Sequence, residues 1–153
     1  VMFANNGPAI INEGPKDTFL NIKDNKEFVV NMSTYDNKDK MNETCFPLAK
    51  GESEIDLAKL ETRESKLVKP KTLSVSPINM ECELYKILDL PVNNKNEYNG
   101  IIIGKVLGIY IDDDYIVDGI IDVKKLKPLA RLGYMDYSIV DSFFQMNRPR
   151  QEW

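Results

Sequence analysis

The pattern of apolar and polar positions predicts a chain built mainly from β-strands. The strongest apolar run spans residues 101–111, and Gly104 and Gly108 interrupt it, which is typical of bulges or of a close backbone approach. Shorter apolar runs at residues 1–4 and 26–34 are also predicted strands. Several strands with few short helices indicate an antiparallel β-barrel or sandwich decorated by helices.

Residues 78–84 alternate between apolar and polar positions, which predicts a strand with one face exposed. On this pattern Cys82 is a small core residue, while Glu81 and Glu83 lie on a solvated face. The highly charged residues 61–71 are predicted to pass over the surface without joining the core.

Acidic residues 112–114 are expected to form a hairpin tip, since aspartate is common in turns and the alternating ligand spacing of a calcium loop is missing. The shorter apolar run at residues 115–121 is then expected to pair back on residues 101–111.

A short helix is predicted to begin after Gly14-Pro15 and to end near residue 24. Asp17 or Thr18 would cap its start, and Phe19 and Ile22 would face inward at three-residue spacing. Further short helices are predicted within residues 35–48, at residues 53–60 with Ser53 as the cap, and around residues 124–126.

Composition limits the classes of function. The 153 residues fit a single domain over residues 1–153. The absence of histidine excludes Ser-His-Asp and Cys-His catalysis and histidine-ligated metals. Cys45 and Cys82 form no paired motif, so we expect a reducing compartment, the cytoplasm. A net charge of −4 without a basic block disfavours nucleic acid, and no apolar run reaches the length of a membrane helix.

The start of the first helix is a candidate anion site. Free backbone N–H groups and partial positive charge gather at a helix start, where Lys16 adds a charge and Thr18 a hydroxyl. An ordinary capped surface helix is the alternative interpretation.

A second candidate lies in the apolar stretch at residues 128–133. A half-buried Arg131 there would need a partner, either a salt bridge or an anionic ligand or flavin carbonyl. Tyr134 and Tyr137 follow at helical spacing and would serve as core or interface aromatics, or would cover a flat ring.

In their order and spacing, these segments together resemble the flavin reductase-like family of FMN-binding split barrels, which includes flavoredoxin-type proteins. The matching pieces are residues 15–18 with Asn21-Ile22, residues 27–31, Ser53-Glu54, Ser76-Pro77 with Glu81-Cys82, residues 103–106, residues 128–133, Tyr137, and Arg148-Pro149. The resemblance implies a six-stranded Greek-key split β-barrel that forms a homodimer with FMN at the interface.

The resemblance also implies roles for individual residues. Lys16 and Thr18, with Asp17 and Asn21 beside them, would lie at the FMN phosphate, and Arg131 and Tyr137 would lie near the flavin. Family members carry a further segment before the point at which this chain begins. We therefore expect either that this sequence is incomplete at its N-terminus or that its flavin site lacks part of the wall around the ring.

The expected function is an FMN-dependent oxidoreductase that transfers hydride from NAD(P)H to flavin, with NAD(P)H bound transiently because no glycine-rich dinucleotide fingerprint is present. Two alternatives stay open. One is a flavin-binding or electron-transfer module without reductase turnover, and the other is a dimeric structural protein that has lost the ligand.

Overall fold

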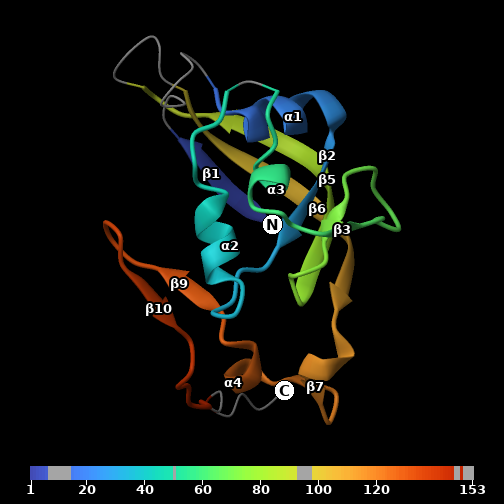
Figure 1. Cartoon of the computed structure of the whole chain (residues 1–153), viewed down its shortest axis with the longest axis vertical. Coiled ribbons are helices and arrows are strands. Elements are labelled where there is room, and N and C mark those ends of the chain that lie inside the picture. The colour runs from blue at the N-terminus through green and yellow to red at the C-terminus, as the bar shows by residue number, and fades with distance from the viewer. Residues whose placement is uncertain (7–14, 50, 93–97, 147–148, 150–153) are drawn as a thin grey trace.

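A computed structural model describes residues 1–6, 15–49, 51–92, 98–146 and 149. The predicted break at Gly14 and the matching position Arg148 lie outside the described residues. The described part of the chain contains one main β-sheet, three two-stranded ribbons and a few short helices (Figure 1). This confirms the prediction of a mainly β chain with few short helices.

The main sheet contains four strands in the order β1 (Met2–Asn6), β6 (Asn99–Ile111), β5 (Ile78–Asp89) and β2 (Glu27–Asn31). Every neighbouring pair is antiparallel. All four strands fall on runs that the apolar pattern predicts. β1 and β2 are the two edges of this sheet, and their positions define the candidate site.

Gly104 and Gly108 of β6 allow other side chains to approach the strand closely, as their positions within the apolar run predict. The register between β5 and β6 shifts twice, between Glu81 and Cys82 and between Leu84 and Lys86. A Cβ atom at Gly104 would collide with the Phe28 ring, and one at Gly108 would lie 2.7 Å from the Leu67 Cδ1 atom. Both glycines therefore leave room for a side chain that packs on the sheet.

The core joins the first helix to the sheet. Five buried residues form it: Phe19, Ile22, Phe28, Cys82 and Ile102. Phe3 of β1 packs edge-on against Phe28, with ring centroids 5.8 Å apart. The inward positions Phe19 and Ile22 and the apolar role of Cys82 are thus confirmed.

Helix α1 (Asp17–Asn25) begins earlier than its predicted cap. Lys16 is the N-cap residue, and its carbonyl accepts hydrogen bonds from Phe19 N at 2.9 Å and Leu20 N at 3.2 Å. The prediction that Asp17 or Thr18 caps the helix was wrong, because both residues already lie in its first turn.

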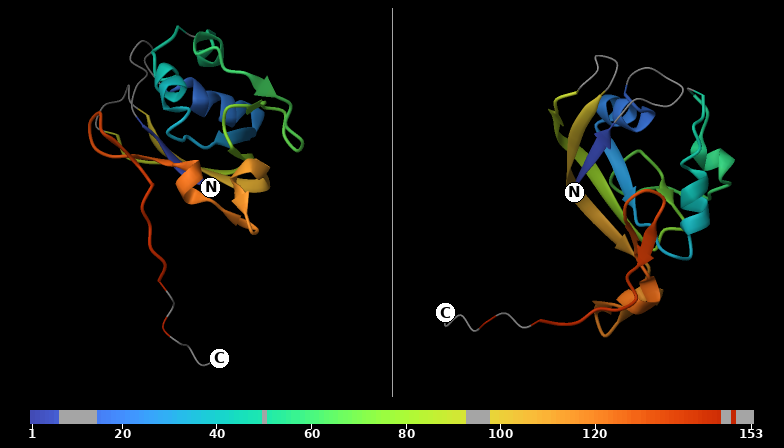
Figure 2. Two further views of the ribbon diagram at one scale, coloured as in Figure 1. Left: turned by 60° about the horizontal axis from the view of Figure 1, so that its bottom comes forward. Right: turned by 90° about the vertical axis from the view of Figure 1, so that its left-hand side faces the viewer.

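Three further short helices are present where they were predicted. These are α2 (Lys38–Glu43), α3 (Glu54–Leu57) and α4 (Val123–Leu126). The Ser53 hydroxyl accepts a hydrogen bond from Asp56 N at 3.4 Å, which confirms its role as cap. Helices α2 and α3 lie on one side of the main sheet, as the right-hand view in Figure 2 shows.

The prediction of a half-exposed β5 was wrong at one end of the strand. Asn79 and Glu81 are buried, because the segment that contains β3 (Thr62–Arg63) and β4 (Thr72–Leu73) folds over them. The Glu81 carboxylate accepts a 2.6 Å hydrogen bond from Leu67 N and 3.1 Å bonds from Lys66 N.

The charged segment is therefore tied down at several points. Val68 is buried, so the segment also contributes to the packed interior, in contrast to its predicted course over the surface. At the other end of β5 the prediction holds, since Glu83 stays partly exposed and pairs with Lys105 at 3.1 Å.

The acidic residues after β6 form a turn, as predicted. Within it lies the single-turn 3-10 helix η1 (Asp113–Tyr115), and the Asp112 carboxylate accepts a hydrogen bond from Asp114 N at 3.0 Å. β7 (Ile116–Val117) and β8 (Ile120–Ile121) then pair with each other, so the prediction that this segment pairs back on β6 was wrong.

The turn between β7 and β8 explains why these two strands pair with each other. Asp118 and Gly119 have φ angles of 51° and 75°. Two successive residues with positive φ are typical of a tight type I′ hairpin, which Asp-Gly sequences favour.

The C-terminal part forms another ribbon, from β9 (Leu129–Arg131) and β10 (Tyr137–Ile139). Tyr134 lies in the turn of this ribbon and Tyr137 in its second strand, so the helical spacing inferred for them was wrong. Residues 141–146 extend away from the body of the molecule (Figure 2). Among the described residues, no helix is long and apolar enough to cross a membrane.

Candidate functional site

A cavity of about 850 Å³ lies between the two edge strands of the main sheet and α1. Residues of both edge strands line it, and Phe3 of β1 and Phe28 of β2 are in contact. The lining residues are 1–3 from the start of the chain and β1, Thr18, Asn21, Ile22 and Asn25 from α1, 27–30 from β2, and Ile55, Pro70 and Lys71.

The cavity combines an apolar wall with a polar end. Phe3, Phe28 and Val30 contribute apolar surface from the two edge strands. Thr18 and Asn21 contribute a hydroxyl and an amide, and their three-residue spacing puts them on one face of α1. A cavity of this size and composition is typical of small-molecule sites.

The start of α1 supplies the positive character of this polar end. Lys16 has an extended backbone (φ −65°, ψ 154°), and no side-chain hydrogen bond caps the helix within the described part of the chain. Phe19 N already donates to the Lys16 carbonyl, so among the described residues the N–H groups of Asp17 and Thr18 are left for an acceptor. Lys16, Asp17, Thr18 and Asn21 are all exposed.

Two of the four predicted α1 residues line the cavity, and two do not. Thr18 and Asn21 belong to the lining, whereas Lys16 and Asp17 stand beside it at the helix start. Lys71 is a lining residue that the sequence did not reveal. It enters from the loop before β4, and its amine pairs with the Glu64 carboxylate at 2.8 Å.

Arg131 and Tyr137 come together, but in a different place. Arg131 Nη1 donates a 3.1 Å hydrogen bond to the Tyr137 hydroxyl, and Nη2 donates one of 3.2 Å to the Tyr134 carbonyl. The predicted burial of Arg131 was wrong, because β9 lies in an exposed ribbon and the guanidinium faces solvent. Tyr137 lines a separate cavity of about 280 Å³, beside Tyr35.

A single copy of the chain therefore does not gather all six predicted residues around one cavity. The β9–β10 ribbon lies away from α1 in Figure 1. Thr18 and Asn21 face the cavity between β1 and β2, whereas Arg131 and Tyr137 are displayed on the ribbon.

Burial raises the pKa of three described groups, Cys82, Tyr98 and Tyr115. Burial raises the pKa of the Cys82 thiol above its ordinary value. Burial, followed by the nearby Asp89 carboxylate, raises the pKa of Tyr98. Among the same residues, no group of three acidic, cysteine or histidine side chains is placed to hold a metal.

The sequence of this chain is similar to those of known proteins. Residues 8–125 match the profile of the flavin reductase like domain family. An uncharacterized protein of Halalkalibacterium halodurans is 31% identical over 135 residues, which cover 88% of this chain. The chain spans 65% of that relative's length.

Solved structures share the fold. Nitrilotriacetate monooxygenase component B from Bacillus cereus superposes with a TM-score of 0.86 at 29% identity, over 95% of this chain and 70% of that chain. A split-barrel protein of Shewanella frigidimarina NCIMB 400 superposes with a TM-score of 0.75 at 21% identity, over 86% and 65% of the two chains. These similarities show a split-barrel fold.

Proposed function

The chain belongs to the flavin reductase like family, and from this premise we propose that it is an FMN-binding oxidoreductase that takes hydride from NAD(P)H. The observation that carries the proposal is the cavity between β1 and β2, which has apolar walls and is lined by Thr18 in the first turn of α1. FMN has a flat apolar ring system at one end and a phosphate at the other, so its two ends match the two ends of the cavity.

The phosphate would lie at the start of α1. Backbone N–H groups of the first helical turn would donate to its oxygens, with the Thr18 hydroxyl and the Lys16 amine beside them. Asn21 would donate from the next turn on the same face. Asp17 would help to hold the first turn through its favourable interaction with the helix dipole.

The remaining lining residues would hold the ring. The edge-on pair of Phe3 and Phe28 gives this wall a fixed shape, since both rings are also packed against the core. When bound, FMN would supply the redox chemistry by accepting hydride and passing on two electrons. The protein's own part is to bind, orient and partly shield the cofactor, and this needs no histidine.

We further propose that the active form is a homodimer in the cytoplasm. Arg131 and Tyr137 would then approach the flavin from the β9–β10 ribbon of a second copy. This arrangement reconciles the predicted role of the two residues with their distance from α1 in one copy. The two free cysteines, exposed Cys45 and buried Cys82, agree with a reducing compartment.

Titration of the purified full-length protein with FMN, followed by absorbance and flavin fluorescence, tests cofactor binding. Saturable binding with a shifted flavin spectrum is the expected result. A protein that fails to bind excess FMN would be a structural member of the family, and the proposal would be wrong.

Rapid mixing of the FMN complex with NADH and with NADPH tests hydride transfer. Loss of the oxidised flavin absorbance at a rate that supports turnover is expected with at least one of the two. If the complex forms but neither nucleotide bleaches it, the protein is a flavin-binding or electron-transfer module without reductase turnover.

A further inference from the structure

A second cavity lies on the other side of α3, between this helix and α2, and has a volume of about 760 Å³. Its described lining residues include the apolar side chains of Phe46, Pro47 and Leu57, the thiol of Cys45, and the charged side chains of Lys40, Glu43 and Lys59. None of these residues lines the cavity between β1 and β2. Helix α3 forms a wall of both cavities, through Ile55 on one side and Leu57 on the other.

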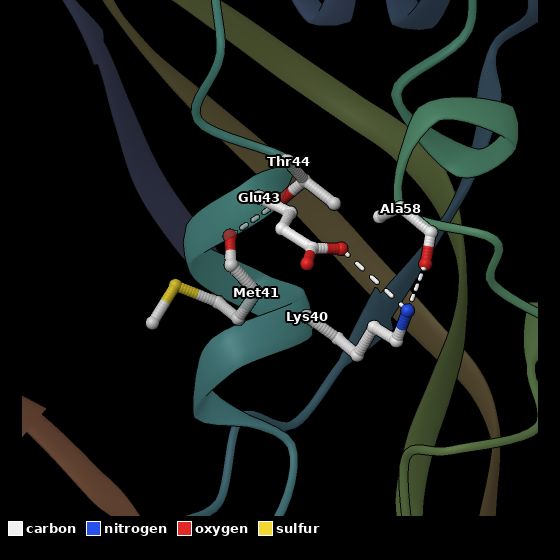
Figure 3. Close-up of polar contacts among 5 residues, drawn as sticks. All are labelled: Lys40, Met41, Glu43, Thr44 and Ala58. Carbon is white, nitrogen blue, oxygen red and sulfur yellow. Dashed lines mark hydrogen bonds and ion pairs between the residues drawn. The ribbon is translucent and has the colours of Figure 1, made fainter.

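Lys40 fixes the shape of this second cavity. Its amine donates a 2.5 Å hydrogen bond to the Ala58 carbonyl at the end of α3 and pairs with the Glu43 carboxylate at 3.5 Å (Figure 3). Ala58 is fully buried, so the bond holds the two helices together at a packed point. The Thr44 hydroxyl donates to the Met41 carbonyl at 2.7 Å and closes the end of α2.

The charge balance of the lining indicates what the cavity would hold. Lys40 and Glu43 neutralise each other, which leaves Lys59 as the one remaining positive charge among the described lining residues. The apolar side chains beside it are unusually open, since Phe46 is 60% exposed. An exposed apolar surface next to one free cation matches a molecule with one negative charge and an apolar body.

We propose that the cavity between α2 and α3 binds an organic monoanion with an aromatic body, an aryl carboxylate. The ring would pack on Phe46 and Leu57, and the carboxylate would pair with Lys59. A single cation favours a carboxylate over a doubly charged phosphate. Binding at this site needs no flavin, so this proposal can be tested independently of the proposed function.

Cys45 provides a direct readout, because its thiol lines this cavity and is exposed, whereas Cys82 is buried. Alkylation by uncharged iodoacetamide, followed by intact-protein mass spectrometry without flavin, would report on the cavity alone. The probe is 2-naphthoate, and its neutral counterpart 2-naphthamide controls for ring stacking. A Cys45→Ser variant should take up no label under the same conditions.

Millimolar 2-naphthoate is expected to slow alkylation of Cys45 several-fold, and 2-naphthamide is expected to do so less. Lys59→Ala should weaken the protection about threefold, the scale of one solvent-exposed ion pair, and Phe46→Ala should weaken it further. In the matched surface variant Lys124→Ala on α4, 2-naphthoate should protect Cys45 as well as it does in the original chain. Equal protection by acid and amide, protection unaffected by Lys59→Ala, or no protection at all would overturn the proposal.

Discussion

Two regions of the molecule differ in how far their apolar residues are buried. One is the main sheet together with α1, and the other is the C-terminal segment from β9 to residue 146. In the first region, Phe19, Phe28 and Ile102 are buried in one cluster. In the second, Tyr134 is 94% exposed and Phe144 is 81% exposed. The second region is a two-stranded ribbon, and it is joined to the rest of the molecule by contacts such as the hydrogen bond from Leu129 N to the Ser33 carbonyl.

The two regions therefore differ in how much of their apolar surface is covered within one copy of the chain. The sheet region is a packed unit with a preformed cavity. The C-terminal region displays large apolar side chains on a ribbon and an extended segment, and exposed surfaces of this kind mark interaction sites. The proposed flavin site divides along the same line, with Thr18 in the first region and Arg131 in the second.

The largest effect is expected from Phe28→Ala. Phe28 packs against Phe3 and covers Gly104, so its removal leaves a cavity at the centre of the sheet region. We expect a loss of about 3–5 kcal/mol in the free energy of unfolding, measured by urea denaturation. Phe144→Ala, the matched change in the C-terminal segment, should alter this free energy by less than about 0.5 kcal/mol when both variants are measured at a protein concentration below the dimer dissociation constant. Similar losses in both variants would contradict the division.

The second test removes the exposed aromatics at residues 143 and 144. In the Phe143→Ser/Phe144→Ser double variant, the dimer dissociation constant is expected to rise about 30-fold or more, because buried aromatic residues at an interface cost about 2 kcal/mol when truncated. Sedimentation velocity across a concentration series measures it.

The control for this test is Val117→Ser/Ile120→Ser, which changes exposed apolar residues on the β7–β8 ribbon. Its dissociation constant should match that of the original chain. A monomeric original chain, or a double variant at residues 143 and 144 that still dimerises normally, would exclude the C-terminal segment as the interface.

Lys16→Ala tests how much the sheet region, through Lys16, contributes to FMN affinity. Loss of one charge-assisted contact with a phosphate is worth about 1.5–3 kcal/mol, so FMN affinity should weaken roughly tenfold or more. Fluorescence titration measures the change. Lys23→Ala, in the last turn of the same helix, is the control and should bind FMN normally. Unchanged affinity in Lys16→Ala would make Lys16 an ordinary surface lysine.

A pH series tests the burial of Cys82. Because burial raises its pKa, the folded state keeps the thiol protonated at a pH at which the unfolded chain has lost the proton. The free energy of unfolding should thus fall as pH rises above about 8.5, by up to about 1.4 kcal/mol per pH unit. Cys82→Ala should flatten this fall, and Cys45→Ala, at an exposed position, should not.

Local signals predicted most of the sheet region. The apolar runs gave the four strands, and three-residue spacing gave the inward face of α1. The buried state of Asn79 and Glu81 was not predictable in this way, because it depends on a distant charged segment that folds over β5. Lys71 reached the cavity through the same segment, and no local pattern marks it.

The C-terminal half was predicted less well, for two reasons. Asp118-Gly119 is a tight-turn signal for the β7–β8 ribbon, but the apolar run around it equally fits one continuous strand. The positions of Arg131 and Tyr137 could not be derived from the sequence, since three-residue spacing between Tyr134 and Tyr137 fits a helix as well as the observed turn and strand. The cavity itself is lined by segments far apart in the chain, so no local pattern marks it.

The smallest effect on folding, and the finest test of the division, is expected from Arg131→Ala. Its hydrogen bonds to Tyr137 and Tyr134 are exposed, so the free energy of unfolding should change by less than about 0.5 kcal/mol. FMN affinity should nevertheless fall a few-fold in the dimer, because the ribbon of one copy would approach the flavin of the other. In the Phe143→Ser/Phe144→Ser background the same change should have no further effect on FMN affinity, since the ribbon no longer reaches a second copy. Such non-additivity identifies residues that act through one shared contact. An equal loss in both backgrounds would place Arg131 beside the flavin of its own copy, and no loss in either would leave it a structural residue of the ribbon.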